Sequence, residues 1–134
     1  MAGYYANCLI GPDEAFTWTI DGGLDTLERP SGFSGARAHD VEGTNAVGDL
    51  SMNNLTTAVL WQSGAATLLG IPPGGNYSGA ASICNGVIVG GWGNSVTRPV
   101  RGFVWQDGVM LDLDLPLGPN TGAYDINKAG VITG

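Results

Sequence analysis

The sequence has little of what nucleic-acid-binding and membrane-binding proteins use. Of its 134 residues only 5 are lysine or arginine against 12 acidic residues, which gives a formal net charge of −7. Proteins that bind nucleic acids or anionic membranes need clusters of basic side chains. Here the five basic residues form no run. The charge balance therefore predicts no nucleic-acid partner and no membrane partner.

Histidine and cysteine are also scarce. The single histidine, His39, excludes metal motifs that need two histidines, and no G-x-S-x-G nucleophile motif occurs. We therefore expect no catalytic residue, no metal site and no cofactor, and we interpret His39 as structural. The two cysteines, Cys8 and Cys84, allow one disulfide or none. They fall at different points of the repeat described below, and we interpret them as buried thiols.

Long apolar runs and helical periodicity are missing as well. No stretch approaches the roughly 18 apolar residues of a membrane span, and the N-terminus lacks the basic and apolar regions of a signal peptide. No window shows the i, i+3, i+4, i+7 apolar spacing of a helix. Glycine, in contrast, is abundant at 23 of 134 residues and recurs where tight turns are needed. These features predict an all-β chain.

Three copies of one pattern run through the sequence. Trp18, Trp61 and Trp105 lie 43 and 44 residues apart, and they end the apolar stretches AFTW, AVLW and GFVW. After each tryptophan come a glycine turn, an apolar pair, a Gly/Pro loop and a segment AHDV, AASI or AYDI. A β-branched run then ends in glycine, 30, 29 and 29 residues after the tryptophan. Landmarks at matched spacing indicate a structural repeat of four short strands.

The repeat predicts a single domain over residues 1–134. Two whole four-strand units lie in the middle, and the head (1–27) and the tail (123–134) together supply the strands of a third. A unit of about 43 residues is typical of a β-propeller blade, and propellers have about four to eight blades. We expect three blade-equivalents per chain and six blades in a homodimer, joined by tail-to-head strand pairing that removes open sheet edges. A monomeric β-trefoil or β-prism is the alternative.

The last copy, RGFVWQDGVMLDLDLPLGPNTGAYDINKAGVITG, is similar to the repeats of the HAF family of extracellular repeat proteins. The similarity is close over 101–134 and good over 57–91, where Ser82 and Cys84 replace an aspartate and an asparagine. It is weaker over 14–49, where Glu42 replaces the asparagine. The resemblance implies a propeller-like fold and an extracellular setting, and it carries no established catalytic motif. The sequence itself leaves the compartment unknown.

The connections between strands indicate where a ligand would bind. Because strands alternate in direction, the segments 1–14, 49–57 and 91–102 are expected to form long, varied loops on one face, which is where function is usually carried. Aromatic rings with a few polar partners suit a glycan or a peptide. The alternative is that these rings only pack the loops onto the strands. The candidate ligand-binding residues are Tyr5, Phe33, Tyr77, Trp92 and Arg98.

Other residues are interpreted as structural. The three repeated tryptophans are expected to pack between units, and Asp40 and Asp125 to cap the turn that follows them. Asp112 and Asp114 share a strand face, and we interpret them as edge charges rather than as a metal site. We therefore expect a non-catalytic repeat scaffold that serves as a binding or assembly module. A hydrolase or lyase using carboxylates or His39 is the alternative.

Overall fold

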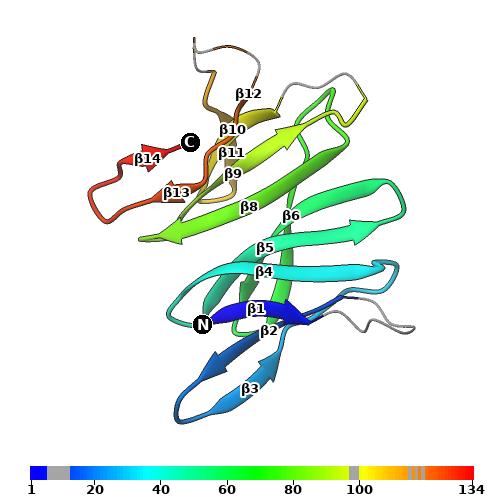
Figure 1. Cartoon of the computed structure of the whole chain (residues 1–134), viewed down its shortest axis with the longest axis vertical. Helices are drawn as coiled ribbons and strands as arrows, with labels where there is room; N and C mark the ends of the chain where they lie inside the picture. The colour runs from blue at the N-terminus through cyan, green and yellow to red at the C-terminus, as the bar shows by residue number, and fades with distance from the viewer. Residues whose placement is uncertain (6–12, 97–99, 115, 117, 119) are drawn as a thin grey trace.

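The computed structural model describes residues 1–5, 13–96, 100–114, 116, 118 and 120–134. Within them the chain forms strands joined by turns and loops, without a helix, and no sheet closes into a barrel. The all-β prediction is confirmed. The sheets follow one another along the longest axis of the molecule, from the N-terminal strands at one end to the C-terminal strands at the other (Figure 1).

Four consecutive strands form the first whole unit, here named unit 1. Each strand pairs antiparallel with the next along the chain. The second and third strands of the unit pair without interruption down to a tight turn, where Met52 lies opposite Leu55. The strands are β4 (Gly35–Glu42), β5 (Asn45–Met52), β6 (Leu55–Gln62) and β7 (Ala65–Gly70).

Unit 2 repeats this meander, again with each strand antiparallel to the next. One parallel bridge, between Thr56 and Tyr77, joins the two units. The buried Ser78 strengthens this junction, because its Oγ accepts from Ala58 N at 2.9 Å and donates to Gly70 O at 2.6 Å. The strands are β8 (Tyr77–Cys84), β9 (Val87–Gly93), β10 (Val100–Gln106) and β11 (Val109–Asp112).

The two ends of the chain form smaller pieces. The head unit is a three-stranded antiparallel sheet, and the tail hairpin is a two-stranded one. A short strand, β12 (Asn120–Thr121), pairs parallel with β10. The head strands are β1 (Ala2–Tyr5), β2 (Glu14–Thr19) and β3 (Gly23–Thr26), and the tail strands are β13 (Asp125–Ile126) and β14 (Ile132–Thr133).

Short dipeptides set the turns between neighbouring strands. Positive φ values occur at both residues of Ser63-Gly64, Asn85-Gly86 and Asp107-Gly108. Two successive residues with positive φ make a type I′ turn, whose twist matches that of the flanking strands. Asn53, with φ 52°, begins the turn between β5 and β6. These local signals explain why the repeat of the sequence becomes a repeat of antiparallel strands.

The glycine that ends each β-branched run has a steric reason. A Cβ at Gly48 would overlap the carbonyl oxygen of Arg37, and a Cβ at Gly90 would overlap that of Gly79. In both units this close approach lies next to a β-bulge in the first strand, between Ala38 and Asp40 in unit 1. Only a residue without a side chain fits such a position.

The units stack face to face through small apolar cores. We name the side of a unit that faces the preceding unit its front, and the opposite side its back. The first core joins Ala15 and Leu27 of the head to Trp61 and Val59 on the front of unit 1. A second core joins units 1 and 2, and a third joins unit 2 to the tail hairpin. The burial of most large apolar side chains therefore depends on a neighbouring unit.

Polar contacts between units recur at the spacing of the repeat. The Asp40 carboxylate accepts from Ser82 Oγ at 2.8 Å and from Ile83 N at 2.9 Å, 42 and 43 residues away. Glu42 accepts from the backbone N–H groups of Asn85 and Gly86 at 2.6 and 3.0 Å. Each contact joins the turn region of one unit to the equivalent region of the next. The first strands of successive units, β4, β8 and β13, therefore follow one another through the stack.

The predicted long connections are shorter than expected. Segment 49–57 is a two-residue turn, because Asn53 adopts a positive φ and lets β5 and β6 pair to their ends. In segment 91–102 the strands extend to Gly93 and from Val100. In segment 1–14, β1 pairs with β2. The prediction that these segments are long loops is wrong in these parts.

Strand β1 also changes the interpretation of the head. Gly3 lies 15 residues before Trp18, as Gly90 lies before Trp105, and a Cβ on either glycine would meet the ring of the opposite phenylalanine. β1 is therefore the head equivalent of β9, and it occupies the edge of β2 that the sequence interpretation assigned to the tail. The predicted head with only two strands is wrong, because the four residues of β1 continue the repeat.

Candidate functional site

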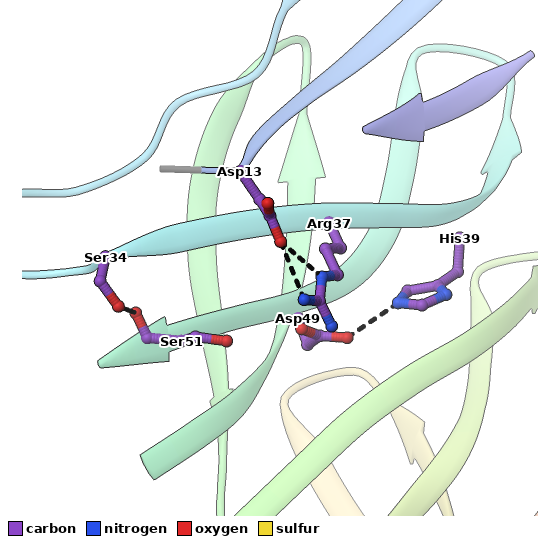
Figure 2. A network of polar contacts seen from close by, with 6 residues as sticks. All are labelled: Asp13, Ser34, Arg37, His39, Asp49 and Ser51. Carbon is purple, nitrogen blue, oxygen red and sulfur yellow. Dashed lines mark hydrogen bonds and ion pairs between the residues drawn. The ribbon is translucent and has the colours of Figure 1, made fainter. Parts of the chain in front are cut away.

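A polar network lies on the first two strands of unit 1 (Figure 2). Arg37 on β4 bonds the Asp13 carboxylate through Nε and Nη2, both at 2.8 Å. On the same strand, His39 Nε2 lies 2.8 Å from Asp49 Oδ2 on β5. The side chains of Arg37 and His39 are 47% and 42% exposed, while that of Asp49 is 14% exposed. The network thus presents a cation, an imidazole and two carboxylates to solvent.

Strand alternation places this network. Ala36 and Ala38 are buried against the head. Arg37 lies between these two residues and His39 follows Ala38, so the side chains of Arg37 and His39 point away from the head. Arg37 pairs with Asp49 in the β4–β5 ladder, which brings the second carboxylate under the same face. The space is open because β8 presents Gly79 here, where even a Cβ would lie 3.8 Å from Asp49 Oδ2.

Of the predicted site residues, Tyr77 begins β8, the strand whose Gly79 approaches Asp49. Tyr77 stands two residues before Gly79, so alternation puts both residues on the same side of β8. Ser51, whose carbonyl accepts from Ser34 Oγ at 3.0 Å, lies two residues after Asp49 on the facing strand. One predicted aromatic residue therefore lies two positions along β8 from the glycine that approaches the polar cluster, which the sequence interpretation did not assemble.

Phe33 and Trp92 occupy corresponding places in two different units. The loop before unit 1 is closed by a bond from Phe33 N to Pro30 O, and the loop before unit 2 by one from Gly75 N to Pro72 O. Phe33 packs against the first core, whereas Gly75 leaves room for the Trp92 ring, 3.1 Å from its built Cβ. In each unit one ring holds the loop against the sheet.

Trp92 has one feature that packing does not explain. Its indole N–H is buried and has no hydrogen-bond partner among the described residues. The guanidinium carbon of Arg101 lies 6.0 Å from the centre of the ring. Arg101 also forms an ion pair with Asp112 at 3.0 Å and lies 3.8 Å from Asp114. Both carboxylates therefore interact with the Arg101 guanidinium.

Other predicted residues fall outside the described part of the chain. Arg98 and Cys8 lie there, and of Tyr5 only the backbone is placed, opposite Glu14 in the β1–β2 ladder. Cys84 is a free thiol, partly buried at the third core. No group of three or more potential metal ligands occurs among the described residues. Nor does that part of the chain contain a helix long and apolar enough to cross a membrane.

The repeated tryptophans differ in burial. Trp61 is fully buried and donates from Nε1 to Glu28 O at 2.7 Å, and Trp105 is half-buried against the second core. The prediction that tryptophan packs between units is confirmed for these two. Trp18 is 42% exposed, so the prediction is wrong for the head within one chain, because no unit in the described part of the chain covers the front of the head.

The recurring aspartates do more than cap a turn. Asp40 Oδ1 accepts from Val41 N at 2.8 Å, and Asp125 Oδ1 accepts from Ile126 N at 2.9 Å. Between them, Ser82 Oγ lies within hydrogen-bond distance of both carboxylates. Because Ser82 replaces this aspartate in unit 2, the amide of the following residue, Ile83, bonds Asp40 of the preceding unit instead.

A crevice of about 530 Å³ separates the head from unit 1 at the end opposite the loops. Comparison of the chain with family models, curated proteins and solved structures gives no match. The function is therefore argued from the geometry. The sequence interpretation did not predict the crevice, in which the head carries Thr17 at the position where unit 1 has the larger Leu60. Its polar lining includes Thr17, Thr19, Asp25, Thr26, Thr44 and Ser63.

Proposed function

We propose that the chain is a non-catalytic repeat scaffold, built of propeller-type blades, that serves as a binding or assembly module. The observation that carries the proposal is that hydrogen bonds between residues 43 positions apart join unit 1 to unit 2 and unit 2 to the tail hairpin. Carboxylates of one unit bind amides of the next about 43 residues on, and each junction has its own apolar core. Such nearest-neighbour stacking is the design of repeat proteins, which use the extended surface for binding.

The arrangement of strands supports a propeller rather than a trefoil or prism. Each whole unit is a simple antiparallel meander of four strands, and the units pack through their faces. That is the architecture of blades around an axis. In this proposal β4, β8 and β13 are the innermost strands. The similarity of the repeats to HAF repeats points in the same direction.

The polar network beside Tyr77 is the proposed binding surface, with a glycan or a peptide as ligand. Arg37, His39 and Asp49 offer donors and acceptors in a small area, and Tyr77 adds a ring with a polar end. Ligands with hydroxyl or amide groups use this mixture of donors and acceptors. The net charge of −7 disfavours an anionic ligand.

A screen on glycan and peptide arrays tests this proposal. We expect a ligand whose affinity falls about 10-fold or more in Arg37→Ala, since a hydrogen bond to a charged group contributes about 1.5–3 kcal/mol. Lys128→Ala is the matched control, because it also removes one exposed cation, in the distant tail turn. Equal binding by both variants would place the ligand elsewhere.

One observation favours the alternative of a hydrolase or lyase. The His39–Asp49 contact at 2.8 Å is the arrangement in which a carboxylate orients an imidazole for acid–base work. A panel of hydrolase and lyase substrates with His39→Ala as the comparison separates the two. Turnover that disappears in His39→Ala supports the enzyme, whereas array binding without turnover supports the scaffold.

A further inference from the structure

The two ends of the stack each carry an uncovered apolar face. On the front of the head, Trp18 pairs across β2 and β3 with Leu24, and these side chains are 42% and 56% exposed. On the back of unit 2, Val104 pairs across β10 and β11 with Leu111, which is 61% exposed. Figure 1 shows the two sheets at opposite ends of the molecule.

These pairs belong to a series that the chain itself contains. On the fronts of units 1 and 2 the equivalent pairs are Trp61–Ala66 and Trp105–Met110, and each packs against the preceding unit. On the back of unit 1 the equivalent of Val104 is Leu60, which unit 2 covers to 5% exposure. At the junction between units 1 and 2, Leu60 of the back pair therefore meets the front pair Trp105–Met110.

These two end pairs are the most apolar of their kinds, and within them Trp18, Leu24 and Leu111 are exposed while Val104 packs partly on the third core. On the backs of the head, unit 1 and unit 2 the pairs are Thr17–Asp25, Leu60–Thr67 and Val104–Leu111. Only the last of these three is apolar in both members. Among the fronts, only the head combines tryptophan with leucine. End units of a stack that face solvent instead carry polar outer faces.

We propose that a second copy of this chain covers these faces, front to back: the head front of one copy docks on the back of unit 2 of the other. The tail hairpin contacts β8 and β9, and the third core reaches Val104 on β10, which leaves β11 with the exposed Leu111 for the head. With three blade-equivalents in each chain, two copies make a ring of about six blades, within the usual range of about four to eight.

The contact is heterologous, because a front meets a back and not another front. Two such contacts close a two-chain ring, and the same contact without closure would give open stacks. This docking uses faces, and it leaves β1 in place on β2, unlike the tail-to-head strand pairing expected from the sequence. The inference rests on the proposed scaffold role, since it continues the internal stacking between chains.

Light scattering after size-exclusion chromatography tests the docking at micromolar concentration. We expect twice the chain mass for the wild type and the single-chain mass for both Trp18→Glu and Leu111→Glu. Val96→Glu, at an 85% exposed loop position, is the matched control and keeps the double mass. Circular dichroism establishes that each variant is folded, which is expected because both substituted side chains are already exposed.

Mixing the two variants is the decisive arm. Trp18→Glu retains an intact back and Leu111→Glu an intact front, so an equal mixture regains the two-chain mass through one intact contact. Three results would overturn the docking. The first is a folded wild type with the mass of a single chain, and the second is a two-chain mass that Leu111→Glu leaves unchanged. The third is a wild-type mass that keeps increasing with concentration. The array screen is separate: a single chain that still binds ligand through Arg37 overturns this docking but not the proposed function.

Discussion

Trp18 and Trp61 stand at the same point of the repeat in opposite surroundings. Trp61 lies in the third strand of unit 1 and Trp18 in the equivalent strand β2 of the head, each after an apolar stretch, yet Trp18 is 42% exposed and Trp61 is fully buried. The difference comes from the neighbour: the head packs on the front of unit 1, and no unit among the described residues packs on the front of the head. In a stacked repeat, burial is a property of the junction rather than of the strand.

The largest expected effect separates these two tryptophans. Trp61→Ala should lower the free energy of unfolding by about 3–5 kcal/mol, because it empties a packed junction and removes the bond to Glu28 O. Trp18→Ala should cost under about 1 kcal/mol, as exposed substitutions do. Urea denaturation measures both, in the Leu111→Glu background so that self-association does not contribute. Equal losses would mean that the head front is already packed within one chain.

A pair of glycines gives the next contrast. Gly48→Ala should cost about 3 kcal/mol, because a Cβ there would overlap the carbonyl of Arg37 and one strand must move. Gly43→Ala should cost roughly 1 kcal/mol, since only its positive φ of 60° resists and no atom lies within 4 Å. Thermal unfolding monitored by circular dichroism gives the order. A reversed order would show that the strands adapt more easily than the turn.

Two aspartates compare the junction between the whole units 1 and 2 with the junction between unit 2 and the two-stranded tail hairpin. Asp40 binds Val41 N in its own strand and both Ser82 Oγ and Ile83 N in the next unit. Asp40→Ala should therefore cost about 2–3 kcal/mol, as bonds to charged groups are lost. Asp125→Ala, in the tail hairpin, should cost about 1 kcal/mol, because Asp125 binds its own strand and the Ser82 hydroxyl alone.

Asp40→Asn is the control for this pair. It keeps one carboxamide oxygen as acceptor and should lose less stability than Asp40→Ala. Chemical denaturation of the three variants under one condition measures the order. If Asp125→Ala were as costly as Asp40→Ala, the contacts within the strand rather than those between units would dominate.

The repeat could be predicted from the sequence because its signals are local. Apolar strands and turn pairs such as Asp107-Gly108 appear in order along the chain, and the structure places a strand at each of them. Strand β1 was missed because the segment lacks the β-branched run of its equivalents. The 15-residue spacing from Gly3 to Trp18, equal to that from Gly90 to Trp105, is the signal that identifies it.

The candidate site was harder to predict, since it depends on register. Arg37, His39 and Asp49 converge only because β4 and β5 pair with a bulge between Ala38 and Asp40. Nothing in the composition marks these residues as a group. The predicted aromatic residues fall in different places: Phe33 packs against the first core, whereas Tyr77 begins β8 beside unit 1. The chemistry of individual residues suggested a site with polar and aromatic side chains, but the cluster itself forms only through the pairing of β4 with β5.

The smallest expected effect concerns the ion pair that crosses the same junction as Trp61. Asp13 precedes β2 of the head, and its carboxylate binds Arg37 of unit 1 at 2.8 Å. Arg37 is 47% exposed, so solvent screens the pair, and Arg37→Ala should change stability by under about 1 kcal/mol. The backbone bond from Ala36 N to Asp13 O at 2.8 Å remains in the variant and keeps the strands aligned. Denaturation with and without added salt measures the contribution. A loss close to that of Trp61→Ala would mean that charge rather than apolar packing holds the head on unit 1, and the exposed front at Trp18 would then say little about what a second copy could cover.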